Sequence, residues 1–85
     1  MKYCKKEAIK VKKVGEGYLF ENGIGVNETS FNIYELCNNN TAEEIFELLK
    51  KDYNLSELDL EEIYEDICSC LEQLCEVEVI IKVEE

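Results

Sequence analysis

The segment that most constrains this chain runs from Leu60 to Val77, because its apolar residues all fall on one half of a helical wheel. At about 100° per residue, the apolar half spans roughly 180°. Its members are Leu60, Ile63, Tyr64, Ile67, Cys68, Cys70, Leu71, Leu74, Cys75 and Val77. A helix that only covers a small core needs an apolar stripe a little over about 100° wide. The pattern therefore predicts an amphipathic helix with apolar surface to spare for a second molecule.

This helix is predicted to end near Val77, because Glu78 would otherwise lie at the centre of the apolar face. Beyond it, the residues alternate with the period of a strand that is buried on one face. The alternation sets Val77, Val79, Ile81 and Val83 against Glu78, Ile80, Lys82 and Glu84. We therefore expect a C-terminal strand over residues 78–83, with the first of these two sets on its buried face.

Three short strands are predicted before the first helix, at Ala8 to Val14, Tyr18 to Glu21 and Ile24 to Val26. Asn22 and Gly23 separate the last two strands. This dipeptide is a strong hairpin signal because both residues accept a positive φ angle.

Two helices are predicted between these strands and Leu60. Asn27 is the expected N-cap of the first, because its side chain can accept a hydrogen bond from a free backbone amide. This helix should reach Cys37 and end at the asparagines 38–40, which tolerate the left-handed conformation.

The second predicted helix opens with a capping box formed by Thr41 and Glu44. Residues 54–59 should link it to the third helix, where Asp59 and Glu62 are expected to cap each other. The element order predicts an α+β fold. A three-stranded antiparallel sheet is followed by three helices in a winged helix-turn-helix arrangement, with an extra C-terminal strand.

The length of 85 residues predicts a single domain over residues 1–85, with a small core of marginal stability. No window of about 18 apolar residues occurs, and the first residues contain no apolar stretch like that of a signal peptide. We therefore expect a cytoplasmic protein without membrane contact.

The five cysteines do not follow the pattern of a secreted disulfide framework, because their number is odd and three of them share the helix from Leu60. No histidine is present, and no CxxC pair supports a zinc site. The main interpretation is that the cysteines are reduced thiols acting as small apolar side chains. A metal or disulfide role is the alternative.

The net charge of −11 is unevenly distributed. Residues 1–13 contain six lysines and one glutamate, whereas nineteen of the twenty acidic residues follow them. The chain has no arginine, so it lacks the planar group that binds phosphate in a bidentate way. A lysine-guarded strand edge is the favoured interpretation of the basic start, and a nucleic-acid-binding arm is the alternative.

Catalytic signatures are missing from the sequence. Histidine is absent, no GxSxG, GxGxxG or GxxxxGK[ST] pattern occurs, and the four glycines lie at predicted turns. A core of this size also leaves little room for a substrate pocket of roughly 300 Å³ or more. The sequence therefore predicts a protein that is not an enzyme and holds no cofactor.

A winged helix-turn-helix often binds DNA through its third helix. Here that helix exposes a row of acidic residues, which are Glu61, Glu62, Glu65, Asp66, Glu72 and Glu76. Affinity for DNA comes largely from lysine and arginine against phosphates, so this face should repel a duplex. No nucleic-acid partner is expected.

Three features in order resemble the PqqD-like proteins, also called RiPP recognition elements, over about residues 14–75. The first is a short hairpin that leads into Asn27-Glu28-Thr29 and a helix with Ile33 and Leu36. The second is Thr41-x-x-Glu44-Ile45, and the third is Glu65-Asp66-Ile67 followed by Leu71 and Leu74. The resemblance implies a winged-helix module without catalysis. Such a module binds the leader segment of a ribosomally made precursor peptide and presents it to a modifying enzyme, often a radical S-adenosylmethionine (radical SAM) protein.

The resemblance also implies where the peptide would bind. In the family the leader adds as a strand beside the third strand and rests on the third helix. Carried onto this chain, the candidate peptide-binding residues are Ile24, Gly25, Val26, Asn27, Tyr64, Ile67, Cys68, Leu71 and Cys75. An exposed strand edge beside apolar helix surface fits this role, and Gly25 removes a side chain where another backbone could approach. A hairpin glycine without such a role is the alternative explanation of Gly25.

Two departures from the family pattern stand out: the three asparagines after the first helix, and the chain beyond the third helix. The terminal strand either covers a sheet edge or docks to the enzyme. Two other functions stay open. One is a winged-helix regulator acting through protein contacts, and the other is a thiol-based metal or redox protein.

Overall fold

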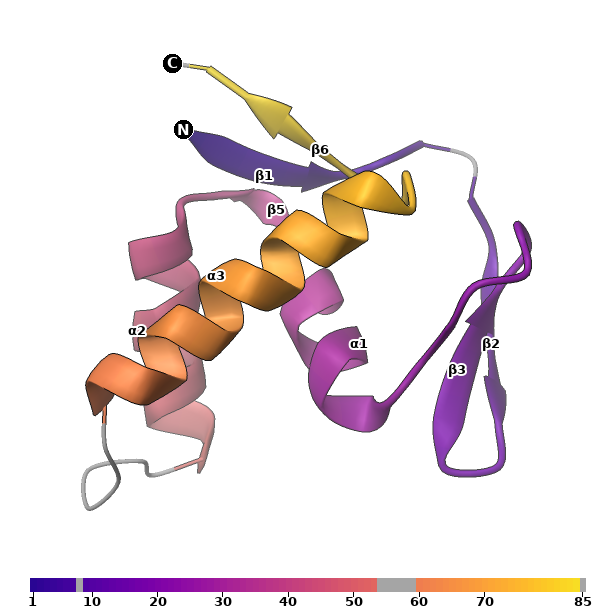
Figure 1. Ribbon diagram of the computed structural model, residues 1–85, viewed down its shortest axis with the longest axis horizontal. Helices are drawn as coiled ribbons and strands as arrows, with labels where there is room; N and C mark the ends of the chain where they lie inside the picture. Colours follow the sequence, from indigo (N-terminus) through magenta and orange to yellow (C-terminus); the bar gives the residue numbers. More distant parts are fainter. Residues whose placement is uncertain (8, 54–59, 85) are drawn as a thin grey trace.

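The computed structural model describes residues 1–7, 9–53 and 60–84. In chain order, the elements are β1 (Lys2–Lys5), β2 (Val11–Val14), β3 (Gly17–Phe20), β4 (Gly25–Val26), α1 (Glu28–Glu35), β5 (Asn38–Asn40), α2 (Ala42–Tyr53), α3 (Leu60–Glu76) and β6 (Ile80–Val83). The predicted α+β fold is confirmed: a three-stranded antiparallel sheet precedes three helices and a C-terminal strand (Figure 1). None of the helices in the described ranges combines the length and the apolar character needed to cross a membrane.

The predicted sheet consists of β2, β3 and β4 in that order. Tyr18 of β3 pairs with Val26, and Leu19 pairs with Gly25. Gly17 is needed where β3 and β4 come closest, because a Cβ atom there would lie 2.9 Å from the carbonyl oxygen of Val26. The strand bounds differ from the predicted ones by one to three residues, and Ala8 lies outside the described residues.

The turn before β4 differs from the expected one. Gly23 has a φ of 90°, but Asn22 does not share its positive φ. Instead, the Asn22 side chain accepts a hydrogen bond from the Ile24 amide at 3.3 Å and donates one to the Val77 carbonyl at 3.0 Å. The asparagine therefore ties the hairpin to the end of α3, which short-range turn rules do not foresee.

The predicted caps of α1 and α2 are confirmed. The Asn27 side chain accepts from the Ser30 amide at 2.8 Å. At the start of α2, the Thr41 hydroxyl accepts from the Glu44 amide at 3.1 Å, and the Glu44 carboxylate accepts from the Thr41 amide at 2.8 Å. The expected pairing of Asp59 with Glu62 lies outside the described residues.

The first helix ends earlier than predicted: α1 stops at Glu35 with Leu36 as its C-cap, before the expected end at Cys37. The asparagines 38–40 instead form a strand that the sequence did not predict. Asn39 has a φ of 63°, and the Asn40 side chain donates to the Leu36 carbonyl at 2.8 Å. Residues 38–40 constitute β5, which pairs with β1.

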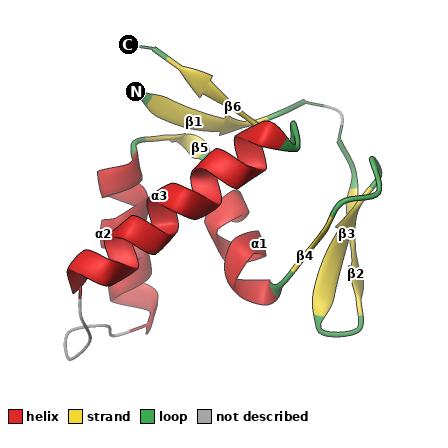
Figure 2. Ribbon diagram, in the orientation of Figure 1, coloured by secondary structure: helices red, strands yellow, loops and turns green. Residues whose placement is uncertain are grey.

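A second antiparallel sheet has the order β5-β1-β6 and joins the two ends of the chain (Figure 2). The pairing of β1 with β6 brings Lys2 opposite Val83. The strand β1 was not predicted, because its pairing partners lie far along the chain.

The end of α3 near Val77 is confirmed and has the geometry of a Schellman motif. Glu78 has a φ of 63°, and its amide donates to the Cys75 carbonyl at 3.1 Å. The Val79 amide donates to the Leu74 carbonyl at 3.1 Å.

The predicted buried face of the terminal strand is wrong. Val79 is fully buried, but the buried residue of β6 is Ile80, whereas Ile81 and Val83 are 46% and 38% exposed. The left-handed residue of the Schellman turn, Glu78, comes just before Val79, so the regular alternation begins only after the turn. Val79 and Ile80 are both buried, which strict alternation does not allow.

The three helices and both sheets share one hydrophobic core. Its largest fully buried side chains come from β3, α2, α3, β6 and the segments next to them, and they are Phe20, Ile45, Leu71, Ile80, Val79 and Cys37. The α3 helix crosses both α1 and α2, so it contributes to the core along most of its length (Figure 1).

Candidate functional site

The candidate site begins at β4, the edge strand of its sheet and the strand of that sheet nearest the helices (Figure 2). The Phe20 amide donates to the Ile24 carbonyl at 2.9 Å. In an antiparallel ladder, hydrogen-bonded pairs alternate with pairs whose backbone groups point outward. The N–H and C=O of Gly25, which lies opposite Leu19, are therefore directed to the free edge.

The fold itself does not require glycine at position 25. A Cβ atom built on Gly25 would meet only the Tyr18 carbonyl oxygen, at an ordinary 3.9 Å, and Gly25 is not among the residues with positive φ. The residue is exposed. The absence of a side chain therefore leaves space for a second backbone beside β4.

The residues next to Gly25 already have roles in the fold. Ile24 and Val26 are half-buried and pack against the hydrophobic core. The side chain of Asn27 caps α1, as described above. Of these four predicted site residues, Gly25 is the one whose backbone groups point to the free edge.

The predicted site residues on α3 divide into two groups. Ile67 and Leu71 are 3% and 0% exposed, so they belong to the core. Tyr64, Cys68 and Cys75 are half-buried, but they lie on the border of the apolar face that is turned away from β4.

Tyr64 faces α2. Its hydroxyl donates to a carboxylate oxygen of Glu43 at 2.8 Å, and its ring meets the Phe46 ring edge to face, with 5.5 Å between centroids. This hydrogen bond to Glu43 is the main cause of the raised pKa of Tyr64 and also lowers the pKa of Glu43.

Cys68 and Cys75 face the sheet formed by the chain ends. Both thiols lie close enough to Tyr3 of β1 to raise its pKa, after the larger effect of burial. The expected juxtaposition of β4 with Tyr64, Cys68 and Cys75 is therefore not observed. On a helical wheel, the apolar half of α3 has two borders. Tyr64, Cys68 and Cys75 lie on the border that faces α2 and β1.

The opposite border of α3 faces α1 and the hairpin. The Cys70 thiol lies beside Ser30 at the start of α1, and the Val77 carbonyl accepts from Asn22 in the turn before β4. Gln73 lies between them at helical spacing and is exposed. We call Cys70, Gln73 and Val77 the β4-side flank. Cys70 and Val77 belong to the apolar half of the helical wheel, but the sequence contains no signal for which border of that half β4 approaches.

All five cysteines are free thiols. Burial raises the pKa of Cys37 to about 12, and its thiol donates to the Ile33 carbonyl at 3.3 Å. Burial also raises the pKa values of Cys70 and Cys75. Over the described ranges, no three cysteine or acidic side chains are grouped closely enough to hold a metal ion.

Comparison with known proteins gives one family. The model of the family described as Coenzyme PQQ synthesis protein D (PqqD) matches residues 18–80, which include every element from β4 to α3. Searches of curated proteins and of solved structures found no match. Because the family model covers most of the chain, this protein belongs to the PqqD family, the family of RiPP recognition elements.

Proposed function

We propose that this protein binds the leader segment of a ribosomally made precursor peptide and presents the peptide to a modifying enzyme. Membership in the PqqD family suggests a peptide-binding partner of a biosynthetic enzyme, and known members are non-catalytic accessory proteins. In this proposal the ligand is a precursor peptide, and the modifying enzyme is a radical SAM protein.

The free edge of β4 is the observation that carries this proposal. A peptide that adds as a strand gains backbone hydrogen bonds at the edge and specificity from alternate side chains. The exposed N–H and C=O of Gly25 offer such bonds, and the missing Cβ leaves room for the incoming chain. We place the peptide's side chains on the β4-side flank, with Ile24, Val26 and Asn27 supporting the edge strand from within the fold.

A titration of the ¹⁵N-labelled protein with the precursor peptide encoded beside its gene tests the proposal. We expect amide shifts in residues 23–27 and at the β4-side flank. Gly25→Pro removes the N–H at the free edge and should weaken binding at least about tenfold, since a buried backbone acceptor of the peptide loses its donor. Gly25→Ala keeps the N–H but adds the Cβ atom, so it should weaken binding less than Gly25→Pro does.

Two further variants locate the site on α3. Gln73→Ala trims an exposed side chain of the β4-side flank and should weaken binding a few-fold. Tyr64→Phe changes only the border that faces α2 and should bind normally. Strong binding by Gly25→Pro, together with shifts around Glu43 and Tyr64, would instead place the peptide between α2 and α3. Circular dichroism of each variant checks that the fold is retained.

The second candidate function is a regulator that acts through protein contacts, favoured by the three-helix architecture and by the acidic outer face of α3. The neighbouring reading frames distinguish the two functions. A short peptide gene beside a radical enzyme gene supports the peptide role, whereas an operator-like repeat supports the regulator.

A further inference from the structure

The chain has a second free strand edge, at β6. This strand pairs with β1 on one side, and no described strand pairs with it on the other. The Lys6 amide donates to the Val79 carbonyl at 3.0 Å, so residues 79, 81 and 83 direct their backbone groups to β1. The N–H and C=O of Ile80 and Lys82 therefore point to the free edge.

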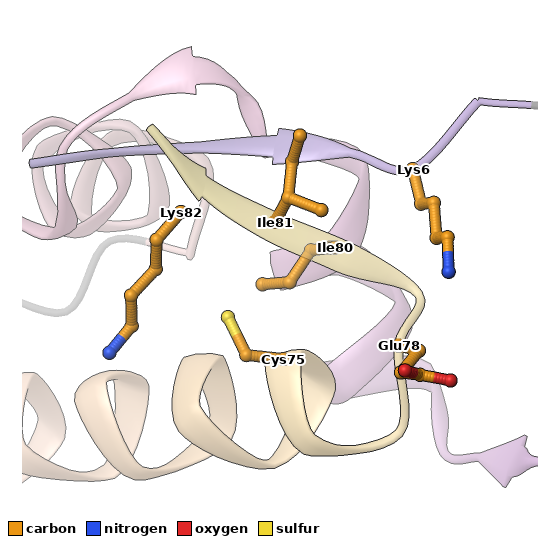
Figure 3. A pocket seen from close by; sticks show the side chains of 6 residues that line it. All are labelled: Lys6, Cys75, Glu78, Ile80, Ile81 and Lys82. Atoms are coloured by element: carbon orange, nitrogen blue, oxygen red, sulfur yellow. The ribbon is translucent and has the colours of Figure 1, made fainter. Parts of the chain in front are cut away.

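A groove with a volume of about 470 Å³ lies between β6 and the C-terminal end of α3 (Figure 3). Its walls are formed by Lys6, Cys75, Glu78, Ile80, Ile81 and Lys82. In the close view, Cys75 and Ile80 point toward each other between α3 and β6, while Lys82 and Lys6 lie toward opposite ends of the groove. An apolar centre is thus flanked by two cationic side chains, and the Glu78 carboxylate lies at the same end of the groove as Lys6.

The charge of this sheet is opposite to that of the protein as a whole. The strands β1 and β6 contain three lysines and no acidic residue, although Lys5 forms an ion pair with Glu35 and the chain carries a net charge of −11. The same sheet exposes apolar side chains, since Ile81 and Val83 are 46% and 38% exposed. Exposed apolar area with a charged rim is typical of protein interaction sites.

We propose that the β6 edge and its groove bind an extended strand of a partner protein in which acidic and apolar residues alternate. The partner backbone pairs with Ile80 and Lys82, one of its apolar side chains fills the groove over Cys75 and Ile80, and its carboxylates meet Lys6 and Lys82. This surface lies on the opposite border of α3 from β4, and the inference does not depend on the role proposed for β4.

The charge of the protein favours an acidic partner strand at the β6 edge over a second copy of the chain. Two copies with a net charge of −11 each repel one another, and pairing of two β6 edges brings their lysines together. An acidic partner strand meets the basic sheet without that cost. Lysine on a sheet edge can also serve only to prevent edge pairing, and the experiment below separates these roles.

The test uses two capped synthetic hexapeptides, one with alternating Glu and Val and one with alternating Lys and Val, titrated into the ¹⁵N-labelled full chain. We expect the acidic peptide to shift the amides of Lys6 and residues 78–82, and to bind at least about tenfold more tightly than the basic one. Raising the salt concentration from about 0.05 M to about 0.5 M should weaken its binding several-fold.

Proline at position 82 is the decisive variant, because it removes an edge N–H and leaves the ladder with β1 intact. Lys82→Pro should lose at least about tenfold in affinity for the acidic peptide, and Lys82→Ala, which loses only the charge, should lose less. Gly25→Pro should leave this binding unchanged. Loss of acidic-peptide binding at β6 can therefore be distinguished from loss of leader binding at β4.

Three results would overturn the inference. Equal binding of both peptides would show an edge without charge selection, and binding of neither would show that the lysines only guard the edge. Dimers of the free protein in light scattering that dissociate in Lys82→Pro would show that a second copy occupies the edge. If Lys82→Pro has lost its circular dichroism signal, the charge comparison of the two peptides on the wild type decides the matter.

Discussion

Single residues with special backbone or side-chain roles mark the ends of the helices in this protein. Glu78, just after α3, has a φ of 63°, a conformation that costs most residues about 1–2 kcal/mol. Asn27, Thr41 and Glu44 satisfy free amides at helix starts, as their positions in the sequence predicted. Such roles are local, so a short window of sequence is enough to identify them.

Cys37 carries the clearest prediction at this scale. Burial raises its pKa to about 12 from an ordinary value of 9.0, so the folded protein holds a proton that the unfolded chain releases. The free energy of unfolding should therefore be unaffected below pH 9 and should fall as the pH rises from about 9 to about 12. Burial raises the pKa values of Tyr3 and Tyr34 as well, which adds to the loss above pH 10.

Urea unfolding at a series of alkaline pH values measures this effect. Cys37→Ala should be less stable at neutral pH because it leaves a cavity, but its stability should decline less steeply above pH 9. Parallel slopes for the two proteins would mean that the Cys37 thiol does not contribute. In thiol labelling at pH 8, Cys37 should react last and the half-buried Cys4 much earlier.

At the scale of elements, α3 organises the molecule because its apolar half contacts partners on both borders. One border packs on α2 and the terminal sheet, through Tyr64, Cys68 and Cys75. The other meets α1 and the hairpin, through Cys70 and Val77. The wide apolar face is therefore partly explained by the terminal sheet. Of the strands in this sheet, only the C-terminal one was predicted from the sequence.

The orientation of β6 gives a matched pair of variants. Ile80→Ala removes a side chain that is 1% exposed and should cost about 2–4 kcal/mol of stability. Ile81→Ala removes one that is 46% exposed and should cost less than about 1 kcal/mol. Denaturant unfolding of both variants provides the comparison. A larger loss of stability for Ile81→Ala than for Ile80→Ala would instead support the buried face that the sequence predicted.

At the scale of the whole molecule, the distribution of charge separates possible partners. Six acidic residues lie along α3 without a single lysine, whereas β1 and β6 carry only lysines as charged residues. The acidic residues of α3 and Lys82 of β6 are exposed, and the lysines of β1 are half-buried. The acidic helix and the basic sheet favour different ligands on different sides of one small protein.

We expect no binding to duplex DNA at physiological salt. Nonspecific binding with a dissociation constant of about 10⁻⁴ to 10⁻⁶ M depends on basic groups that meet phosphates, and the outer face of α3 has none. A fluorescence anisotropy titration with a labelled duplex at about 0.15 M salt measures this, with a lysine-rich DNA-binding protein as the positive control. Salt-dependent binding in that range would favour the regulator over the peptide role.

The sequence by itself determined the parts of this protein that depend on neighbours a few residues away. The amphipathic α3, the caps of α1 and α2, the hairpin that leads into β4 and the end of α3 near Val77 all follow from local periodicity and side-chain chemistry. The order of these elements, together with short motifs, also carried the resemblance to the PqqD family that the family model confirmed.

Only the tertiary structure decided which surfaces these elements present. The strand β1 forms because residues near 40 and 80 come to lie on its two sides, and no local window contains those partners. The two borders of the apolar half of α3 are equivalent on a helical wheel. Tyr64 and Cys75 face away from β4, and Cys70 and Val77 face the hairpin, because packing in three dimensions selects one of two orientations that the sequence pattern allows equally.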